Sequence, residues 1–302
     1  MAECIQDVAV VGAGIAGLSA AVFLGRAGRS TVIYDGGRPR IFAVDEVREY
    51  VGFDGVSPAN VLAAAREEAL KYGVTIRKEL VERIDARSDG LFEVRGATKI
   101  LARAVVLATG LTDEVPRLEG LAEPWGNDLR VCPCFDGFEV RNKRFVVFGV
   151  PERLAHMGSW VSMWSPHVTV VSKGKIEPEG EERLRKLGIR IVSDEVTGLL
   201  HKERQLVGVK TESGATIPCD ATWVAMRYKA TSNLAASLCD VDEYGIVRSS
   251  DGCRTSRPGV FAVGNASDAV AHMAHAAAAG TKVGPIVTMY LLEARLAEAS
   301  RV

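Results

Sequence analysis

The sequence lacks an unbroken apolar run of the ~20 residues that a membrane-spanning helix needs. Glu3 and Asp7 precede the first strand, which is unlike the apolar core of a secretory signal. The net charge is −1 and no block of like charge occurs, so nothing favours nucleic acid or anionic lipid as a partner. We therefore expect a cytoplasmic protein that has neither a membrane nor a nucleic-acid partner.

The six cysteines include no Cys-x-x-Cys pair and no Cys/His cluster at zinc spacing. We therefore expect neither a disulfide framework nor a metal site. Four cysteines stand alone and are predicted to be small buried apolar residues: Cys4, Cys219, Cys239 and Cys253. Only Cys132 and Cys134, in "VCPCFDG", lie close enough in the chain for joint chemistry.

A strand–turn–helix–strand pattern opens the chain. Val8 to Val11 is a β-branched run, the turn that follows has glycines at 12, 14 and 17, and "STVIYD" predicts a second strand that ends at Asp35. Glycine permits the tight turn, the close approach of a diphosphate and the packing of helix on strand. The helix N-terminus would face the diphosphate and Asp35 the ribose. The pattern predicts a dinucleotide site.

A second strand–turn–helix pattern lacks the same glycines. Strands are predicted at Phe145–Phe148 and Val168–Val171, with a helix between them. The turn reads "GVPERL", which puts Pro151, Glu152 and Leu154 where a phosphate-binding turn would have small residues. No arginine pair follows the second strand to bind a 2′-phosphate. We expect that this part keeps the fold and that NADPH binding is unlikely.

These patterns together resemble the two-domain FAD flavoproteins of the thioredoxin reductase class. The matches are the glycine-rich turn, the Ala108-Thr109-Gly110 triplet and "PGVFAVGNASD" from Pro258 to Asp268. The resemblance implies an α/β fold of two Rossmann-like, three-layer domains, the second inserted into the first. Residues 1–113 plus 245–302 would bind FAD, and residues 114–244 would form the NAD(P)-binding-like insert.

The resemblance also implies which residues contact FAD. They are the members of the matching motifs and their neighbours: Gly12, Gly14, Ile15, Ala16, Gly17, Asp35, Gly36, Arg40, Ala108, Thr109, Gly110, Gly264, Asn265, Asp268, His272 and Met273.

The chain is most similar to one branch of this class, the dithiol oxidases of gliotoxin and holomycin biosynthesis and their bacterial relatives. The matches are "YDGGRPR", the asparagine at position 265 and the alanine-rich "DAVAHMAHAAAAG". The branch oxidises small dithiols to disulfides and passes the electrons through flavin to O2, without a need for NADPH. The resemblance therefore implies a homodimeric FAD oxidoreductase that acts on a small dithiol, part of secondary metabolism.

The family motif is Cys-x-x-Cys followed by Asp-Gly or His-Gly. Aligning Asp136-Gly137 puts Cys132 at the first cysteine, Phe135 at the second and Cys134 one residue early. In a helix Cys132 and Cys134 would diverge by roughly 200°, so a bridge requires an extended or turn conformation. A helix N-terminus here would lower a thiol pKa. Asp136 is a candidate proton acceptor or a helix cap.

Three interpretations of the cysteines stay open. The pair is redox-active, or the flavin acts directly on the substrate, or the flavin chemistry is vestigial and the protein binds a ligand or partner. His272 and His275 are three residues apart and share a helix face, where they would move protons near a flavin or simply pack. The alternatives to dithiol oxidation are flavin-dependent oxidation of a non-thiol metabolite and NADPH-dependent disulfide reduction.

Overall fold

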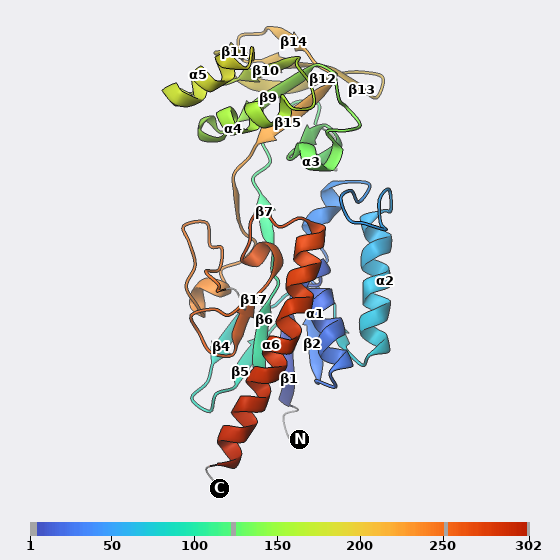
Figure 1. Ribbon diagram of the computed structural model, residues 1–302, viewed down its shortest axis with the longest axis vertical. Helices are drawn as coiled ribbons and strands as arrows, with labels where there is room; N and C mark the ends of the chain where they lie inside the picture. The colour runs from blue at the N-terminus through green and yellow to red at the C-terminus, as the bar shows by residue number, and fades with distance from the viewer. Residues whose placement is uncertain (1–4, 122–124, 251–252, 301–302) are drawn as a thin grey trace. The chain divides into compact units, whose positions relative to one another are not determined.

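The computed structural model describes residues 5–121, 125–250 and 253–300, so Cys4 lies outside it. The chain divides into two compact units (Figure 1). The first comprises residues 1–42, 56–112 and 228–302, and the second comprises residues 43–55 and 113–227. The second unit thus takes most of its residues from the middle of the chain.

The first unit is built on a mostly parallel sheet in the order β3-β2-β1-β6, with β17 also parallel to β6 and an antiparallel extension β5-β4. Its strands are β1 (Ile5–Val11), β2 (Thr31–Tyr34), β3 (Thr75–Arg77), β4 (Arg83–Ala86), β5 (Phe92–Arg95), β6 (Lys99–Leu107) and β17 (Val260–Ala262). Apolar residues fill both faces of β1, as expected for a buried parallel strand.

Three helices accompany the sheet of the first unit: α1 (Ile15–Arg26), α2 (Pro58–Lys71) and α6 (Met273–Ala299). α6 lies alongside α1 because small residues let the two backbones approach (Figure 1). A Cβ atom at Gly280 would lie 2.1 Å from the carbonyl oxygen of Ala16, and one at Gly284 would lie 2.2 Å from the Phe23 ring. Glycine is therefore required at position 280, and a side chain at position 284 would displace the Phe23 ring.

The opposite face of this sheet packs against residues that follow the second unit in the chain. Leu234, Ala235 and Leu238, in and beside η3 (Ala235–Ser237), are buried with Val105 and Val260 of the sheet. This packing explains why residues 228–244 group with the first unit, whereas the sequence led us to expect them in the insert.

The second unit has a parallel sheet in the order β11-β10-β9-β15-β8 and a three-stranded antiparallel sheet β12-β13-β14. The parallel strands are β8 (Leu129–Arg130), β9 (Phe145–Gly149), β10 (Val168–Val171), β11 (Arg190–Val192) and β15 (Ala221–Ala225). The antiparallel strands are β12 (Val196–Lys202), β13 (Gln205–Thr211) and β14 (Thr216–Pro218), and the helices are α3 (Pro133–Asp136), α4 (Pro151–Val161) and α5 (Pro178–Lys186).

The fold confirms the strands expected at Val8–Val11, Phe145–Phe148 and Val168–Val171. The segments that connect the units, β7 (Leu111–Asp113) and β16 (Tyr228–Ala230), pair with each other. Two further crossings between the units, after residues 42 and 55, were not expected. Residues 43–55 follow η1 (Arg40–Ala43) of the first unit but pack within the second.

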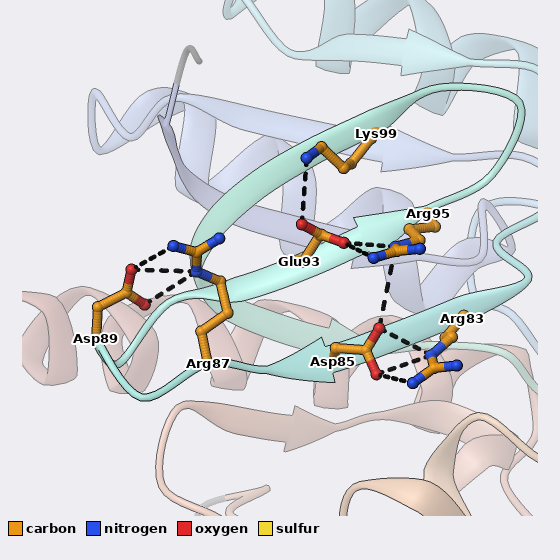
Figure 2. A network of polar contacts seen from close by, with 7 residues as sticks. All are labelled: Arg83, Asp85, Arg87, Asp89, Glu93, Arg95 and Lys99. Carbon is orange, nitrogen blue, oxygen red and sulfur yellow. Dashed lines mark hydrogen bonds and ion pairs between the residues drawn. The ribbon is translucent and has the colours of Figure 1, made fainter. Parts of the chain in front are cut away.

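Charged side chains cover the antiparallel edge of the first unit (Figure 2). The register places Arg83 directly opposite Arg95 and Asp85 opposite Glu93, which are unfavourable like-charge pairs. Ion pairs along each strand and across the diagonal compensate. Arg83 lies 2.8 Å from Asp85, and Arg95 bonds Glu93 and lies 4.0 Å from Asp85. This network keeps the edge charged, which discourages pairing with a foreign strand.

Candidate functional site

The turn between β1 and α1 requires glycine at two positions. Gly12 has φ +112, and a Cβ atom there would lie 2.2 Å from the carbonyl oxygen of Ala108. A Cβ atom at Gly17 would lie 1.9 Å from the carbonyl oxygen of Gly12. Gly14 differs, because no described atom outside its chain neighbours lies within 4 Å of its Cβ position. The space beside Gly14, at the N-terminus of α1, suits a phosphate group.

Two other predicted motifs meet this turn. The N–H of Ala108 donates to the carbonyl of Val11, so the Ala-Thr-Gly triplet follows β6 directly beside Gly12. Gly264 has φ +60, and its Cβ position lies 2.7 Å from the Cβ atom of Ala16. Segments from positions 12–17, 108–110 and 264 therefore gather at the carboxyl ends of β1, β6 and β17, where α/β sheets bind ligands.

Asp35, directly after β2, is held by two partners. Its Oδ2 atom accepts hydrogen bonds from Nε and NH2 of Arg66 at 3.2 and 2.9 Å, and its Oδ1 accepts one from the N–H of Gly37 at 2.8 Å. Only 10% of the Asp35 side chain is exposed. Arg66 comes from α2, 31 residues away, and sequence reasoning missed it because no local motif marks that position.

Asn265 orders the turn before α6. Its Nδ2 atom donates to the carbonyls of Asp268 and Ala271 at 2.9 and 3.1 Å, and its Oδ1 accepts from Arg40 at 3.4 Å. An aspartate could not donate these two hydrogen bonds, which explains why an asparagine suits this position. The predicted residues Arg40, Asn265 and Asp268 are thus brought together.

The two predicted histidines also lie together. His272 is the N-cap of α6 with extended backbone, and His275 lies one turn further. Their ring centroids are 5.8 Å apart. Met273 between them is buried, as is Ala276. Of the other predicted contacts, Gly36 packs tightly, since its Cβ position lies 2.6 Å from the Leu80 side chain.

The cysteine motif belongs to the second unit, between β8 and the end of α3. Cys132 is the N-cap of α3, with φ −147 and ψ 128, and Pro133 begins the helix. The N–H of Cys134 donates to Sγ of Cys132 at 3.4 Å. Both thiols are free and half-buried. Cys132 thus has the extended backbone that a bridge between them requires, whereas Cys134 lies in the first turn of α3.

The surroundings raise both thiol pKa values. Burial raises the pKa of Cys132 far above its ordinary value, and the neighbouring Cys134 raises it further. Burial also raises the pKa of Cys134, but a hydrogen bond from the Cys132 thiol acts in the opposite direction. The expectation that a helix N-terminus would lower a thiol pKa was wrong, because α3 has only four residues and burial dominates. Of the two sulfurs, Cys134 is the one favoured as thiolate.

Asp136 ends α3 and faces Arg130 of β8. Nε of Arg130 lies 2.7 Å from Oδ2 of Asp136. Burial raises the pKa of Asp136 to about 6, with Glu139 acting in the same direction and Arg130 opposing it. A carboxyl group with this pKa can exchange a proton near neutral pH.

The turn between β9 and α4 has the backbone geometry of the turn between β1 and α1, but its side chains differ from those of a phosphate-binding turn. Gly149 has φ +124, and its Cβ position lies 2.4 Å from the carbonyl oxygen of Ala225, which repeats the geometry of Gly12. Pro151 begins α4, and Glu152 in its first turn lies 2.8 Å from Arg227. Leu154, expected to crowd the helix–strand contact, is accommodated in the core under α4.

Comparison with known proteins identifies the family. The model of the family described as pyridine nucleotide-disulphide oxidoreductase matches residues 6–280. The chain belongs to this family. A thioredoxin reductase of Listeria innocua is 24% identical over 87% of this chain and 86% of its own length. A bifunctional thioredoxin reductase/thioredoxin of Mycobacterium leprae is 26% identical over 88% of this chain, which spans only 61% of that longer protein.

Solved structures of this oxidoreductase family agree. The structure of HlmI superposes with a TM-score of 0.93 at 28% identity, covering 98% of this chain and 95% of that one. A thioredoxin reductase TrxB from Bacillus anthracis gives a TM-score of 0.88 at 25% identity, covering 96% and 99%. The recognition of a thioredoxin reductase-like flavoprotein and the α/β fold with two Rossmann-like domains are confirmed.

Two further expectations for this oxidoreductase concern NADPH and the membrane. The family name includes pyridine nucleotides, so the comparisons give no support to the expectation that NADPH binding is unlikely. No helix in the part of the chain that the structure describes combines the length and apolar character needed to cross a bilayer.

Proposed function

We propose that this protein is an FAD-dependent dithiol oxidase. A small dithiol loses two electrons and two protons and becomes a disulfide, and O2 takes them up as hydrogen peroxide. The observation that carries the proposal is that two free cysteines share one turn, in which the backbone N–H of Cys134 donates to Sγ of Cys132, in a disulphide oxidoreductase. Similarity to HlmI supports the choice of branch. The active form would be a cytoplasmic homodimer without a metal.

The residues of the first unit suit FAD. The turn is too tight for a side chain at Gly12 or Gly17. The open space beside Gly14 would receive the diphosphate. Asp35 would accept hydrogen bonds from the adenosine ribose while Arg66 holds the carboxylate in place. Further contacts would come from the Ala108–Gly110 triplet and the Asn265 turn. When bound, FAD accepts two electrons, and O2 can reoxidise the reduced flavin.

The residues of the second unit would handle the substrate. With Cys132 and Cys134 as a disulfide, a substrate thiolate attacks one sulfur and releases the other as a thiolate. The second substrate thiol then attacks the substrate sulfur of the mixed disulfide and releases the remaining protein thiolate. This exchange leaves both protein thiols reduced and the substrate oxidised. Return of the pair to the disulfide would require a bound flavin to take up two electrons, and it would release two protons, one of which Asp136 would accept. His272 and His275 are proposed to move protons in the first unit.

Direct oxidation of the substrate by flavin is a second route, and it leaves the cysteines outside the electron path. The substitution of Phe135 for the second family cysteine supports it, because the two cysteines then have unusual spacing. This route also allows a non-thiol metabolite as substrate.

An NADPH-dependent disulfide reductase is the alternative reaction. The retained turn at Gly149 and the thioredoxin reductases among the relatives support it. Against it stand Pro151, which removes a backbone N–H from the phosphate-facing turn, and Glu152, whose carboxylate would repel phosphate.

The deciding experiment uses the purified holoenzyme and dithiothreitol in air. We expect one H2O2 for each dithiol oxidised, measured by peroxide assay and thiol titration. In a second cuvette without oxygen, NADPH at stoichiometric amounts should leave the flavin absorbance unchanged. Bleaching by NADPH together with the absence of peroxide would establish the reductase instead.

A further inference from the structure

Residues 43–55 lie against the cysteine-bearing segment within the second unit. A Cβ atom at Gly126 would lie 1.6 Å from the carbonyl oxygen of Ala43, so the two backbones touch. Nδ2 of Asn127 donates to Oδ2 of Asp45 at 2.8 Å. These contacts lie just before β8, on the N-terminal side of the cysteines.

The same segment is fixed on the C-terminal side of the cysteines as well. Nε of Arg48 lies 3.4 Å from Oε1 of Glu139, three residues beyond α3. Val47 is buried, and the N–H of Gly55 donates to its carbonyl at 3.0 Å, which closes the segment into a compact loop. Anchored at 127 and at 139, the loop must pass beside the turn that contains Cys132 and Cys134.

The loop is strongly acidic. It contains four carboxylates, at positions 45, 46, 49 and 54, and a single cation, Arg48. Arg48 is shared among Glu46, Asp54 and Glu139, so its charge is more than neutralised. Residues 125–141 do not restore the balance, because they contain three carboxylates and two arginines.

We infer that this loop makes the oxidase selective by charge, with Glu49 as the specificity-determining residue, so that neutral or cationic small dithiols react faster than acidic dithiols. The inference rests on the proposed function and names its substrate class. Glu49 directly follows the anchoring Arg48 and is exposed. Because Arg48 is anchored to Glu139 beyond the cysteines, Glu49 is held on the part of the loop beside them. In agreement with this position, its charge acts, after the larger effect of burial, in the direction that raises the pKa values of Cys132 and Cys134.

The reason for selectivity is Coulomb repulsion in a partly buried setting. A substrate carboxylate that accompanies the attacking thiolate must approach the sulfurs past the acidic loop. Like charges at such separations repel by more than thermal energy when water is partly excluded, and salt weakens the effect. An amine on the substrate would be attracted by the same charges.

The first test compares three small dithiols of different charge at low ionic strength: dihydrolipoate (anionic), dithiothreitol (neutral) and 2-aminobutane-1,4-dithiol (cationic). We expect kcat/KM to rise in that order, each step by about threefold to tenfold. Glu49→Gln should raise the value for dihydrolipoate relative to dithiothreitol by about threefold, and 0.5 M salt should shrink the difference. An unchanged ratio in Glu49→Gln would overturn the inference.

The second test does not depend on turnover. The reduced holoenzyme is alkylated with iodoacetate (anionic) or iodoacetamide (neutral), and modification of Cys132 and Cys134 is followed by peptide mass spectrometry. We expect Glu49→Gln to raise the iodoacetate-to-iodoacetamide rate ratio about threefold. The matched control is Glu182→Gln, which removes the same charge from α5, well separated from α3 in Figure 1.

The two tests separate the inference from the function. A shifted alkylation ratio without dithiol turnover would refute the oxidase and keep the electrostatic role of Glu49. Dithiol turnover with an unshifted alkylation ratio would refute the role of Glu49 and keep the oxidase. An equal shift in Glu182→Gln would also refute it, because the effect would then come from overall charge.

Discussion

Nε of Arg130 lies 2.7 Å from Oδ2 of Asp136, within the segment that contains both cysteines. Despite this cation, burial raises the pKa of Asp136 to about 6. Below that pH the carboxyl group holds a proton and cannot accept one. Flavin reduction by dithiothreitol should therefore rise between pH 5 and 7 with an apparent pKa near 6, measured by anaerobic stopped-flow absorbance.

Asp136→Asn supplies the comparison for that pH profile. We expect the limb near pH 6 to disappear and the rate at pH 7.5 to fall by about 100-fold, as for the loss of a general base. A limb that persists unchanged in the variant would assign the titration to another group. Because Asp136→Asn leaves Arg130 without its counter-charge, circular dichroism should first confirm that the variant is folded.

The cysteine relay makes a prediction about each sulfur. If electrons pass through the pair, Cys132→Ser and Cys134→Ser should each lower dithiol-dependent oxygen consumption by at least about 100-fold, because neither can form the disulfide. Cys239→Ser is the control, since that thiol lies in the first unit and bonds a backbone carbonyl. Full turnover in both variants would leave direct flavin oxidation as the route.

Substitutions of two glycines in the turn between β1 and α1 should affect different properties, one the stability of the fold and the other the binding of FAD. Gly17→Ala should unfold the protein at a markedly lower temperature, because its Cβ atom would lie 1.9 Å from the carbonyl oxygen of Gly12. Gly14→Ala should keep the melting temperature of the FAD-free protein, since the added methyl meets open space. It should nevertheless weaken FAD binding about tenfold, measured by flavin fluorescence, if the diphosphate occupies that space.

Arg66 is predicted to act through Asp35. Arg66→Gln should weaken FAD binding about tenfold, since a charge-assisted pair that orients the carboxylate is lost. Arg66→Lys keeps the charge but loses the contact through two nitrogens, so its FAD affinity should lie between those of the native protein and Arg66→Gln. The double variant Asp35→Asn/Arg66→Gln should bind no worse than Asp35→Asn alone, and additive losses would show that Arg66 acts independently of Asp35.

The sequence was sufficient where a structural requirement is local. Gly12 and Gly17 are demanded by contacts within the turn itself, and the strand at Val168–Val171 follows from its own apolar run. The alanine-rich helix was also expected, but it begins at Met273 and continues to Ala299 through Pro285. Tertiary packing against α1 extends the helix past the residue that would otherwise interrupt it.

Contacts between residues far apart in the chain could not be predicted from the sequence. Nothing near Arg66 marks it as a partner of Asp35, because the pairing depends on how α2 packs beside β2. The grouping of residues 43–55 with the second unit was missed for the same reason, since their apolar and charged residues fit a surface loop of either unit. For the cysteines, spacing revealed an irregular motif, but only the extended backbone of Cys132 shows how its sulfur reaches the backbone N–H of Cys134.

The origin of the loop matters to anyone who exchanges parts between relatives. A chimera that replaces only residues 113–227 would install a foreign cysteine turn and keep the native Arg48, whose partner Glu139 would have been removed. The replaceable module is therefore discontinuous: two stretches of the gene, separated by α2 and most of a sheet, must be transplanted together. If the proposed charge selection holds, natural recombination would have to carry both blocks together to transfer substrate preference.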